Sequence, residues 1–391
     1  VVEAGLWVLR LTSRVGPFDA ARPARAAAAP VEGSAALGID RDLAERAATS
    51  SFVILKDNGV LPLTQPTATQ LPVLLTGAFA HEQQGLLGTW VLDGDPHTVA
   101  TIAPALAAAL RAGSSSPSID RLVVDSGAFP DRTLRLAREA GVTVALVGEH
   151  PYRSGEDSST STLELPPGQL ELLQALSLVA EQLVVVVFAG RALALDALLA
   201  CCDAVILAWH PGTEGGPALA STLTGGRGAS GLLPVSLPRT AGHLPITHAE
   251  RPSGRPIADN ARGAGRYIDS PTAPIRQYGS GATALRYGPL SVNEAQVSHR
   301  DGVLEARVTV TNESSREVRE PVLLMMRDEI AEVTRPVREL VDFTVVTVPA
   351  ASSHEVRFTL PAEAFGYYGR DLTFRVDTGQ ITLTVGWGRE D

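Results

Sequence analysis

The spacing of hydrophobic and polar residues divides this chain into two regions of different pattern. Between Asp40 and Thr247, short apolar runs alternate with longer stretches whose apolar residues recur every three or four positions. The short runs are rich in Val and Leu, as in LVVVVF at 183–188, and predict buried strands, whereas the longer stretches predict helices. Strands separated by helices of this length predict a mostly parallel sheet sandwiched by helices, which is the α/β fold class.

Capping and breaking residues mark the ends of these elements. Asp40 is a candidate N-cap of the first helix, and Gly113 and Gly141 are expected to end two later helices. The expected helices span 41–57, 97–113, 131–141, 166–181, 194–202 and 215–226. The expected strands span 71–79, 121–127, 142–149, 182–190 and 204–212.

From about Leu290 onward, apolar and polar residues alternate instead. Six such runs, separated by turn residues, predict an all-β sandwich of about 100 residues. The runs span 303–312, 320–328, 342–350, 354–362, 372–379 and 381–388.

Two further segments lack the pattern of a folded domain. Residues 1–39 combine a predicted amphipathic helix with an Ala- and Pro-rich linker, and residues 251–289 are rich in Gly, Pro and Arg. The predicted order is therefore a leading segment, an α/β domain at 40–250, a linker, and a β-sandwich at 290–391.

The composition excludes several classes of protein. With 45% hydrophobic and 19% charged residues among 391, the chain is too apolar to be a disordered protein. Its net charge of −10 argues against a nucleic-acid-binding protein, which should carry a basic domain. No stretch approaches the roughly 20 apolar residues that a membrane span needs, so no membrane partner is expected. The only cysteines, Cys201 and Cys202, are neighbours and predict no disulfide framework.

The most polar strand end of the predicted sheet follows residues 142–149. Its loop reads GEHPYRSGEDSSTSTLELPPG and includes Glu149, Arg153, Glu156 and Asp157. Open α/β sheets bind ligands at the carboxyl ends of their strands, so a carboxylate here is a candidate general acid or base. The alternative is a solvated loop that collects charges without any chemical role.

Other catalytic motifs lack their residues. The sequence has no G-x-S-x-G elbow, no P-loop, no H-E-x-x-H and no C-x-x-C. His150 and His210 have no second ligand at helical spacing, so we interpret them as loop or packing residues rather than metal ligands. Trp90 and Trp209 are interpreted as packing residues, with a sugar-stacking platform as the alternative.

Several long stretches agree, in order, with one known family. The most specific reads GRALALDALLACCDAVILAWHPGTEGGPALASTLTGG at 190–226. These stretches resemble glycoside hydrolase family 3, the β-glucosidase and β-xylosidase family, including its fibronectin-III-like C-terminal domain. The stretches that carry the resemblance span 41–63, 86–99, 190–246, 266–281, 333–365 and 367–386.

The resemblance implies a retaining glycosidase that works with two carboxyl groups. One attacks the anomeric carbon, and the other protonates the leaving oxygen and then activates water. In the family, the acid/base is a glutamate on a loop of the α/β domain, and GEDSSTSTLELP is similar to that loop. Glu156 falls on the acid/base position. Asp157 is the alternative on the same loop, and Glu149 is interpreted as structural.

The resemblance also implies what this chain does not supply. The family's nucleophile is an aspartate of an N-terminal (β/α)8 barrel, and residues 1–39 resemble only the last helix and exit of that barrel. We therefore expect the chain to supply the general acid/base for hydrolysis of β-glucosides or related sugars, with the barrel as its missing partner, and to be inactive alone. Carboxylates do all of this chemistry, so no metal or organic cofactor is implied.

Two positions of this loop depart from the family pattern. Thr160 and Thr162 stand where many relatives have Arg and Asp, which changes the charges around the loop. The alternative function is therefore a non-catalytic carbohydrate-binding or scaffold module that pairs with a separate barrel.

Overall fold

The computed structural model describes residues 40–63, 71–113, 121–247, 249, 251 and 285–386. The helix predicted within 1–39 and nearly all of the predicted linker lie outside the described residues, so the domain boundaries stay predictions. Within the described part of the chain, no helix is both long enough and apolar enough to cross a membrane.

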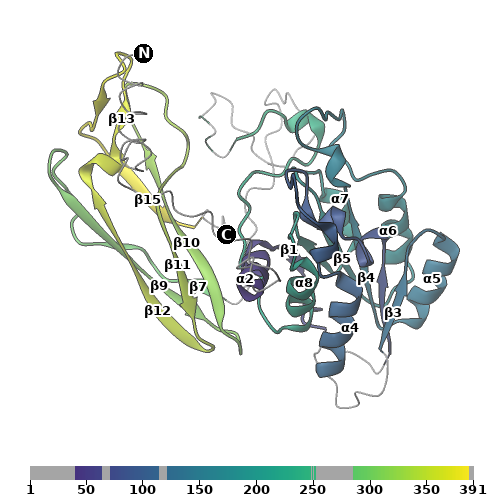
Figure 1. Ribbon diagram of the computed structural model, residues 1–391. Coiled ribbons are helices and arrows are strands. Elements are labelled where there is room, and N and C mark those ends of the chain that lie inside the picture. Colours follow the sequence, from purple (N-terminus) through teal and green to yellow (C-terminus); the bar gives the residue numbers. More distant parts are fainter. Residues whose placement is uncertain are drawn as a thin grey trace, which may run out of the picture. The chain divides into compact units, whose positions relative to one another are not determined.

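A six-stranded sheet forms the centre of the α/β domain (Figure 1). Its strand order is β1-β6-β5-β4-β2-β3, and every neighbouring pair is parallel except β1 with β6. The mostly parallel α/β fold predicted from the spacing is thereby confirmed. The strands are β1 (Val53–Asp57), β2 (Val73–Thr76), β3 (Leu122–Asp125), β4 (Val142–Gly148), β5 (Leu183–Phe188) and β6 (Ala204–Leu207).

Helices cover both faces of this sheet (Figure 1). One apolar core joins α2, α4 and α8 to the sheet, and a second joins α5, α6 and α7 to the opposite face. Every residue of β4 and β5 is buried, which explains their unbroken apolar sequences. The helices are α2 (Arg41–Ser51), α3 (Gln84–Leu87), α4 (Ile102–Ala112), α5 (Pro130–Glu139), α6 (Gln169–Ser177), α7 (Asp196–Cys201) and α8 (Gly215–Thr224).

The helix expected over 41–57 is too long. It ends at Ser51, and residues 53–57 form β1, which pairs antiparallel with β6 from Val53 opposite Leu207. Burial explains the change, because the FVIL run reaches the sheet edge and Leu55 is 2% exposed there. At the N-terminal end of the helix, the prediction of Asp40 as the N-cap is confirmed, because the Leu43 amide donates to the Asp40 carboxylate at 2.9 Å.

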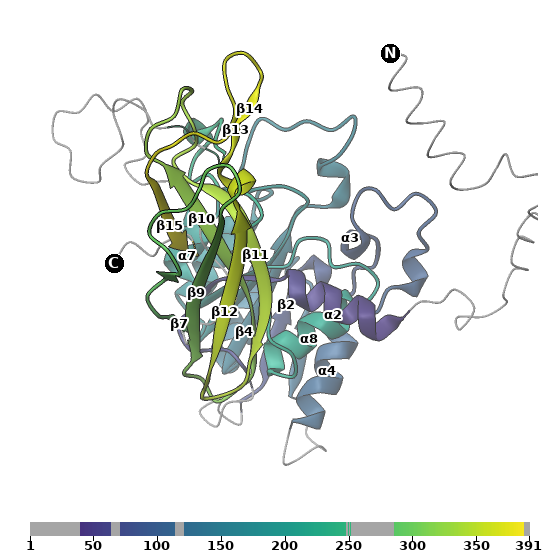
Figure 2. The same cartoon turned by 90° about the vertical axis from the view of Figure 1, so that its left-hand side faces the viewer.

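The C-terminal region is an all-β sandwich (Figure 2). One sheet has the order β11-β10-β15 and the other β12-β9-β7, with β8 paired to β9. Apolar side chains of both sheets meet in one core, as the alternating pattern predicts. The strands are β7 (Leu285–Tyr287), β8 (Ser291–Val292), β9 (Val303–Asn312), β10 (Val318–Asp328), β11 (Glu339–Val348), β12 (Ser352–Pro361), β13 (Tyr367–Tyr368), β14 (Phe374–Arg375) and β15 (Ile381–Val385).

The exit of β4 from the sheet requires glycine. Gly148 has φ +139°, and a Cβ there would lie 1.9 Å from the Phe188 carbonyl oxygen. The Gln169 side chain accepts from the Gly148 amide at 2.8 Å and donates to its carbonyl at 2.9 Å. Strand β4 therefore ends in a fixed geometry, and the loop that follows starts from a rigid point.

We expect Gly148→Ala to destabilise the α/β domain by at least about 3 kcal/mol, because backbone strain and a backbone clash act together. Gly168→Ala is the matched control, since Gly168 has φ +85° but open space around its Cβ position. Strain alone should cost about 1 kcal/mol there. Urea unfolding curves measure both values. Equal losses for the two variants would contradict the packing argument at Gly148.

Candidate active site

Four segments meet at the carboxyl edge of the sheet. They follow β2, β4, β5 and β6, and contacts between their residues join them. Thr89 Oγ1 donates to the Pro151 carbonyl at 2.8 Å, and Arg191 Nη2 donates to Glu149 Oε1 at 2.7 Å. The His210 ring nitrogen Nδ1 lies 3.1 Å from the carbonyl oxygen of Gly85. This edge is where parallel sheets bind ligands.

Glu149 is the buried charge at the centre of this edge. Its side chain is 1% exposed, and both of its oxygens are paired. Arg191 binds it through Nε to Oε2 at 2.9 Å and Nη2 to Oε1 at 2.7 Å, while Arg153 Nε donates to Oε1 at 3.2 Å. Removing one partner of a buried ion pair typically costs about 3–5 kcal/mol. This pairing agrees with the interpretation of Glu149 as structural.

The loop after Glu149 is held by polar contacts along its length. It begins with a 3-10 turn at Pro151–Arg153. Ser158 Oγ donates to the Tyr152 carbonyl at 3.0 Å, and Arg153 Nη2 donates to Thr160 Oγ1 at 3.3 Å. The hydroxyl oxygen of Thr160 therefore accepts from a guanidinium of the same loop.

Glu156 and Asp157 lie at the exposed part of this loop. Neither carboxylate makes a hydrogen bond or an ion pair with any residue that the structure describes. Asp157 has a left-handed backbone with φ +60°. Of the four carboxylates in the loop, Glu149 is buried, whereas Glu156, Asp157 and Glu164 are exposed.

His210 packs under the start of the loop. Burial lowers the pKa of its imidazole, although the hydrogen bond to Gly85 and the charge of Glu149 act in the opposite direction. Its Nε2 atom is buried without a hydrogen-bond partner among the described residues. These contacts agree with the interpretation of His210 as a packing residue.

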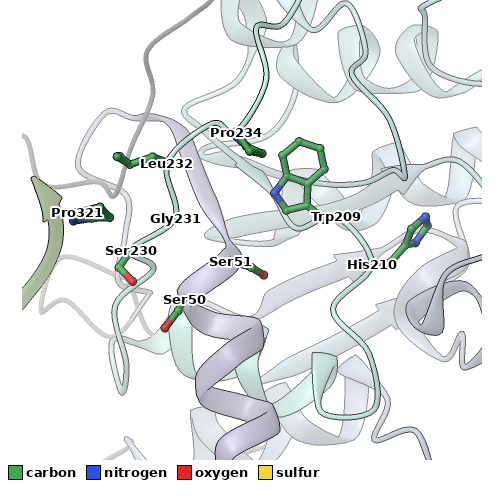
Figure 3. Close-up of a pocket in the computed structure, with 9 residues that line it drawn as sticks. All are labelled: Ser50, Ser51, Trp209, His210, Ser230, Gly231, Leu232, Pro234 and Pro321. Atoms are coloured by element: carbon green, nitrogen blue, oxygen red, sulfur yellow. The ribbon is translucent and has the colours of Figure 1, made fainter. Parts of the chain in front are cut away.

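The two tryptophans of this edge differ in exposure. Trp209 is half-buried and packs against one apolar core, and Figure 3 shows its indole beside Pro234. Both residues also line a pocket of about 330 Å³ that includes Arg191. Trp90 is 66% exposed, so the packing interpretation is wrong for Trp90. It lies close to Gly155, where a Cβ would be 3.5 Å from the indole nitrogen.

Arg191 is a member of this site that the sequence pattern did not predict. Arg191, the first residue after β5 and its Ala-Gly exit, carries the main ion pair of Glu149. A lone arginine at the carboxyl end of a buried strand was the available signal. Among the described residues, no group of three or more His, Cys, Asp and Glu side chains could hold a metal ion.

Two protein-family models match separate segments of the chain. The model described as the glycosyl hydrolase family 3 C-terminal domain matches residues 52–283. The model described as a fibronectin type III-like domain matches residues 320–388.

Individual relatives agree with these matches. A periplasmic β-glucosidase of Salmonella typhimurium is 28% identical over 91% of this chain and 50% of its own length. A β-xylosidase of Formosa agariphila is 27% identical over 97% of this chain and 52% of its own length. The crystal structure of a Listeria innocua β-glucosidase with glucose superimposes with a TM-score of 0.78 at 26% identity, over 89% of this chain and 48% of the other. The chain spans about half the length of the curated relatives it matches.

The half-buried imidazole of His210 predicts a loss of stability in acid. Its pKa is lowered in the folded state, so the unfolded chain binds the proton more readily as the pH falls. The free energy of unfolding therefore decreases below the pH range in which histidine ordinarily titrates. We expect the melting temperature of His210→Gln to fall less than that of the parent protein when the pH is lowered from about 7.5 to about 5. The exposed His97→Gln is the control and should follow the parent. An unchanged acid loss in His210→Gln would contradict the assignment.

Proposed function

This chain belongs to glycoside hydrolase family 3, and we propose that it is the C-terminal part of a retaining β-glycosidase in which Glu156 supplies the general acid/base. The family model covers most of the α/β domain, and relatives with β-glucosidase and β-xylosidase names match most of the chain. The proposed substrates are β-glucosides or related sugars with an O-glycosyl bond.

The observation that carries this proposal is the different state of two glutamates on one loop. Glu149 is buried and paired with Arg153 and Arg191, so it is unavailable for proton transfer. Glu156 is exposed and makes no hydrogen bond or ion pair within the described residues. A general acid/base must reach both the substrate oxygen and a water molecule, which an exposed loop carboxyl group can do.

In the proposed mechanism Glu156 acts twice. Protonated, it gives its proton to the glycosidic oxygen as the bond to the anomeric carbon breaks, and the leaving group departs as a neutral alcohol. As a carboxylate, it then takes a proton from the water that attacks the glycosyl-enzyme. The nucleophile would be an aspartate of the barrel domain, with the two carboxyl groups about 5–5.5 Å apart.

The alternative is a non-catalytic sugar-binding or scaffold module that pairs with a separate barrel. Trp90 favours sugar binding, because its indole is 66% exposed beside Gly155 and aromatic faces stack on sugar rings. By the family resemblance, Thr160 and Thr162 stand where many relatives have Arg and Asp, which leaves this loop with fewer charged side chains.

We expect the purified 391-residue chain to release no nitrophenol from an aryl β-glucoside above the buffer rate, since it supplies only one of the two carboxyl groups. Adding a family 3 barrel domain should give turnover that Glu156→Gln abolishes. Turnover by the chain alone that disappears in Glu156→Gln would contradict the proposal that the nucleophile belongs to a separate barrel domain. Sugar binding without turnover in both settings, measured by calorimetry, would favour the non-catalytic module.

A further inference from the structure

We infer that Glu149 is a positioning residue. Its carboxylate binds the guanidinium groups of both Arg153 and Arg191, and this cluster, the clamp, fixes the loop that presents Glu156. The importance of this position for catalysis rests on the proposed function. The ordering of the loop is a separate physical property of the chain, and it can be measured without any activity.

The clamp is built on the rigid part of the sheet. Glu149 directly follows β4, and its amide donates to the Phe188 carbonyl at 2.8 Å, which extends the pairing of β4 with β5 by one residue. Arg191 follows β5 and holds both oxygens of Glu149 in a two-pronged contact. Such forked pairs fix the orientation of the carboxylate as well as its position.

The third member of the cluster belongs to the loop. Arg153 Nε reaches the same oxygen of Glu149 at 3.2 Å, and its Nη2 reaches Thr160 at 3.3 Å. Arg153 therefore joins the buried carboxylate to the far side of the loop, with Glu156 between its two ends in sequence. No other charged side chain of the loop forms an ion pair with a described residue.

A neutral contact holds the near side of the loop. Thr89 Oγ1 donates to the Pro151 carbonyl at 2.8 Å and lies 3.2 Å from the Ser154 carbonyl. Thr89 Cγ2 would be 2.5 Å from a Cβ at Gly155, the residue before Glu156. Thr89 limits where the loop can begin, whereas Arg153 is the loop side chain that pairs with a buried charge among the described residues.

Loss of the carboxylate would convert the clamp into a repulsive pair. Two guanidinium groups would remain close together without the charge between them, and Arg153 is the more exposed of the two, at 41% against 19%. Arg153 would therefore move to solvent, and the loop would lose its charged contact with the sheet edge. A displacement of about 1 Å in a reacting group can reduce a rate by about 100-fold, so the effect would reach catalysis.

Hydrogen–deuterium exchange of the 391-residue chain tests the inference. We expect amides of residues 150–163 to exchange at least about tenfold faster in Arg153→Gln and Glu149→Gln than in the parent. Arg153→Lys keeps the charge and should restore part of the protection. Arg132→Gln is the matched control, because Arg132 also pairs with a buried carboxylate, Asp125, at 3.2 Å and lies outside this loop.

The outcomes separate a clamp from general destabilisation. The clamp predicts fast exchange confined to 150–163 in Arg153→Gln, with β4 and β5 protected as in the parent. Exchange of residues 150–163 at the parent rate in Arg153→Gln would overturn the inference. Loop exchange that is as fast in Arg132→Gln as in Arg153→Gln would also overturn it. If Glu149→Gln does not fold, Arg153→Gln alone decides, since it removes the loop contact and keeps the Glu149–Arg191 pair. Activity that survives Glu156→Gln would refute the proposed function and leave this result standing.

Discussion

The ion pairs of Glu149 with Arg191 and Arg153 are the constraint on which this edge of the sheet depends. A carboxylate that is 1% exposed is stable only when paired, and its main partner must come from a neighbouring strand. Strands β4 and β5 are adjacent and parallel, so the residues that follow them meet. The parallel sheet thus creates the place where a buried carboxylate can hold the loop that follows β4.

The buried strands explain why the fold could be predicted from the sequence. Val-rich runs such as 183–188 are buried on both faces, so their composition alone indicates a covered parallel sheet. The same reasoning failed at 53–57, because that run follows a helix and pairs with β6, about 150 residues later in the chain. Local spacing contains no information about a partner so distant.

The candidate site shows the same division between local and distant information. The position of the loop after β4 followed from the strand pattern, and the assignment of Glu156 within it came from the family resemblance. Arg191 was missed because its partner Glu149 lies 42 positions away, and the contact of His210 with Gly85 spans 125 positions. The exposure of Trp90 was missed because tryptophan is usually buried, and only the folded chain places it beside Gly155.

Azide rescue distinguishes Glu156 from Asp157 as the proposed acid/base. The measurement uses a protein that joins a family 3 barrel to these 391 residues, with Glu156→Ala, Asp157→Ala and the parent compared on an activated aryl β-glucoside. We predict that azide accelerates Glu156→Ala alone and yields the β-glycosyl azide, because azide attacks the glycosyl-enzyme without needing a general base. Parent-like turnover in Glu156→Ala, or rescue of Asp157→Ala instead, would contradict the account.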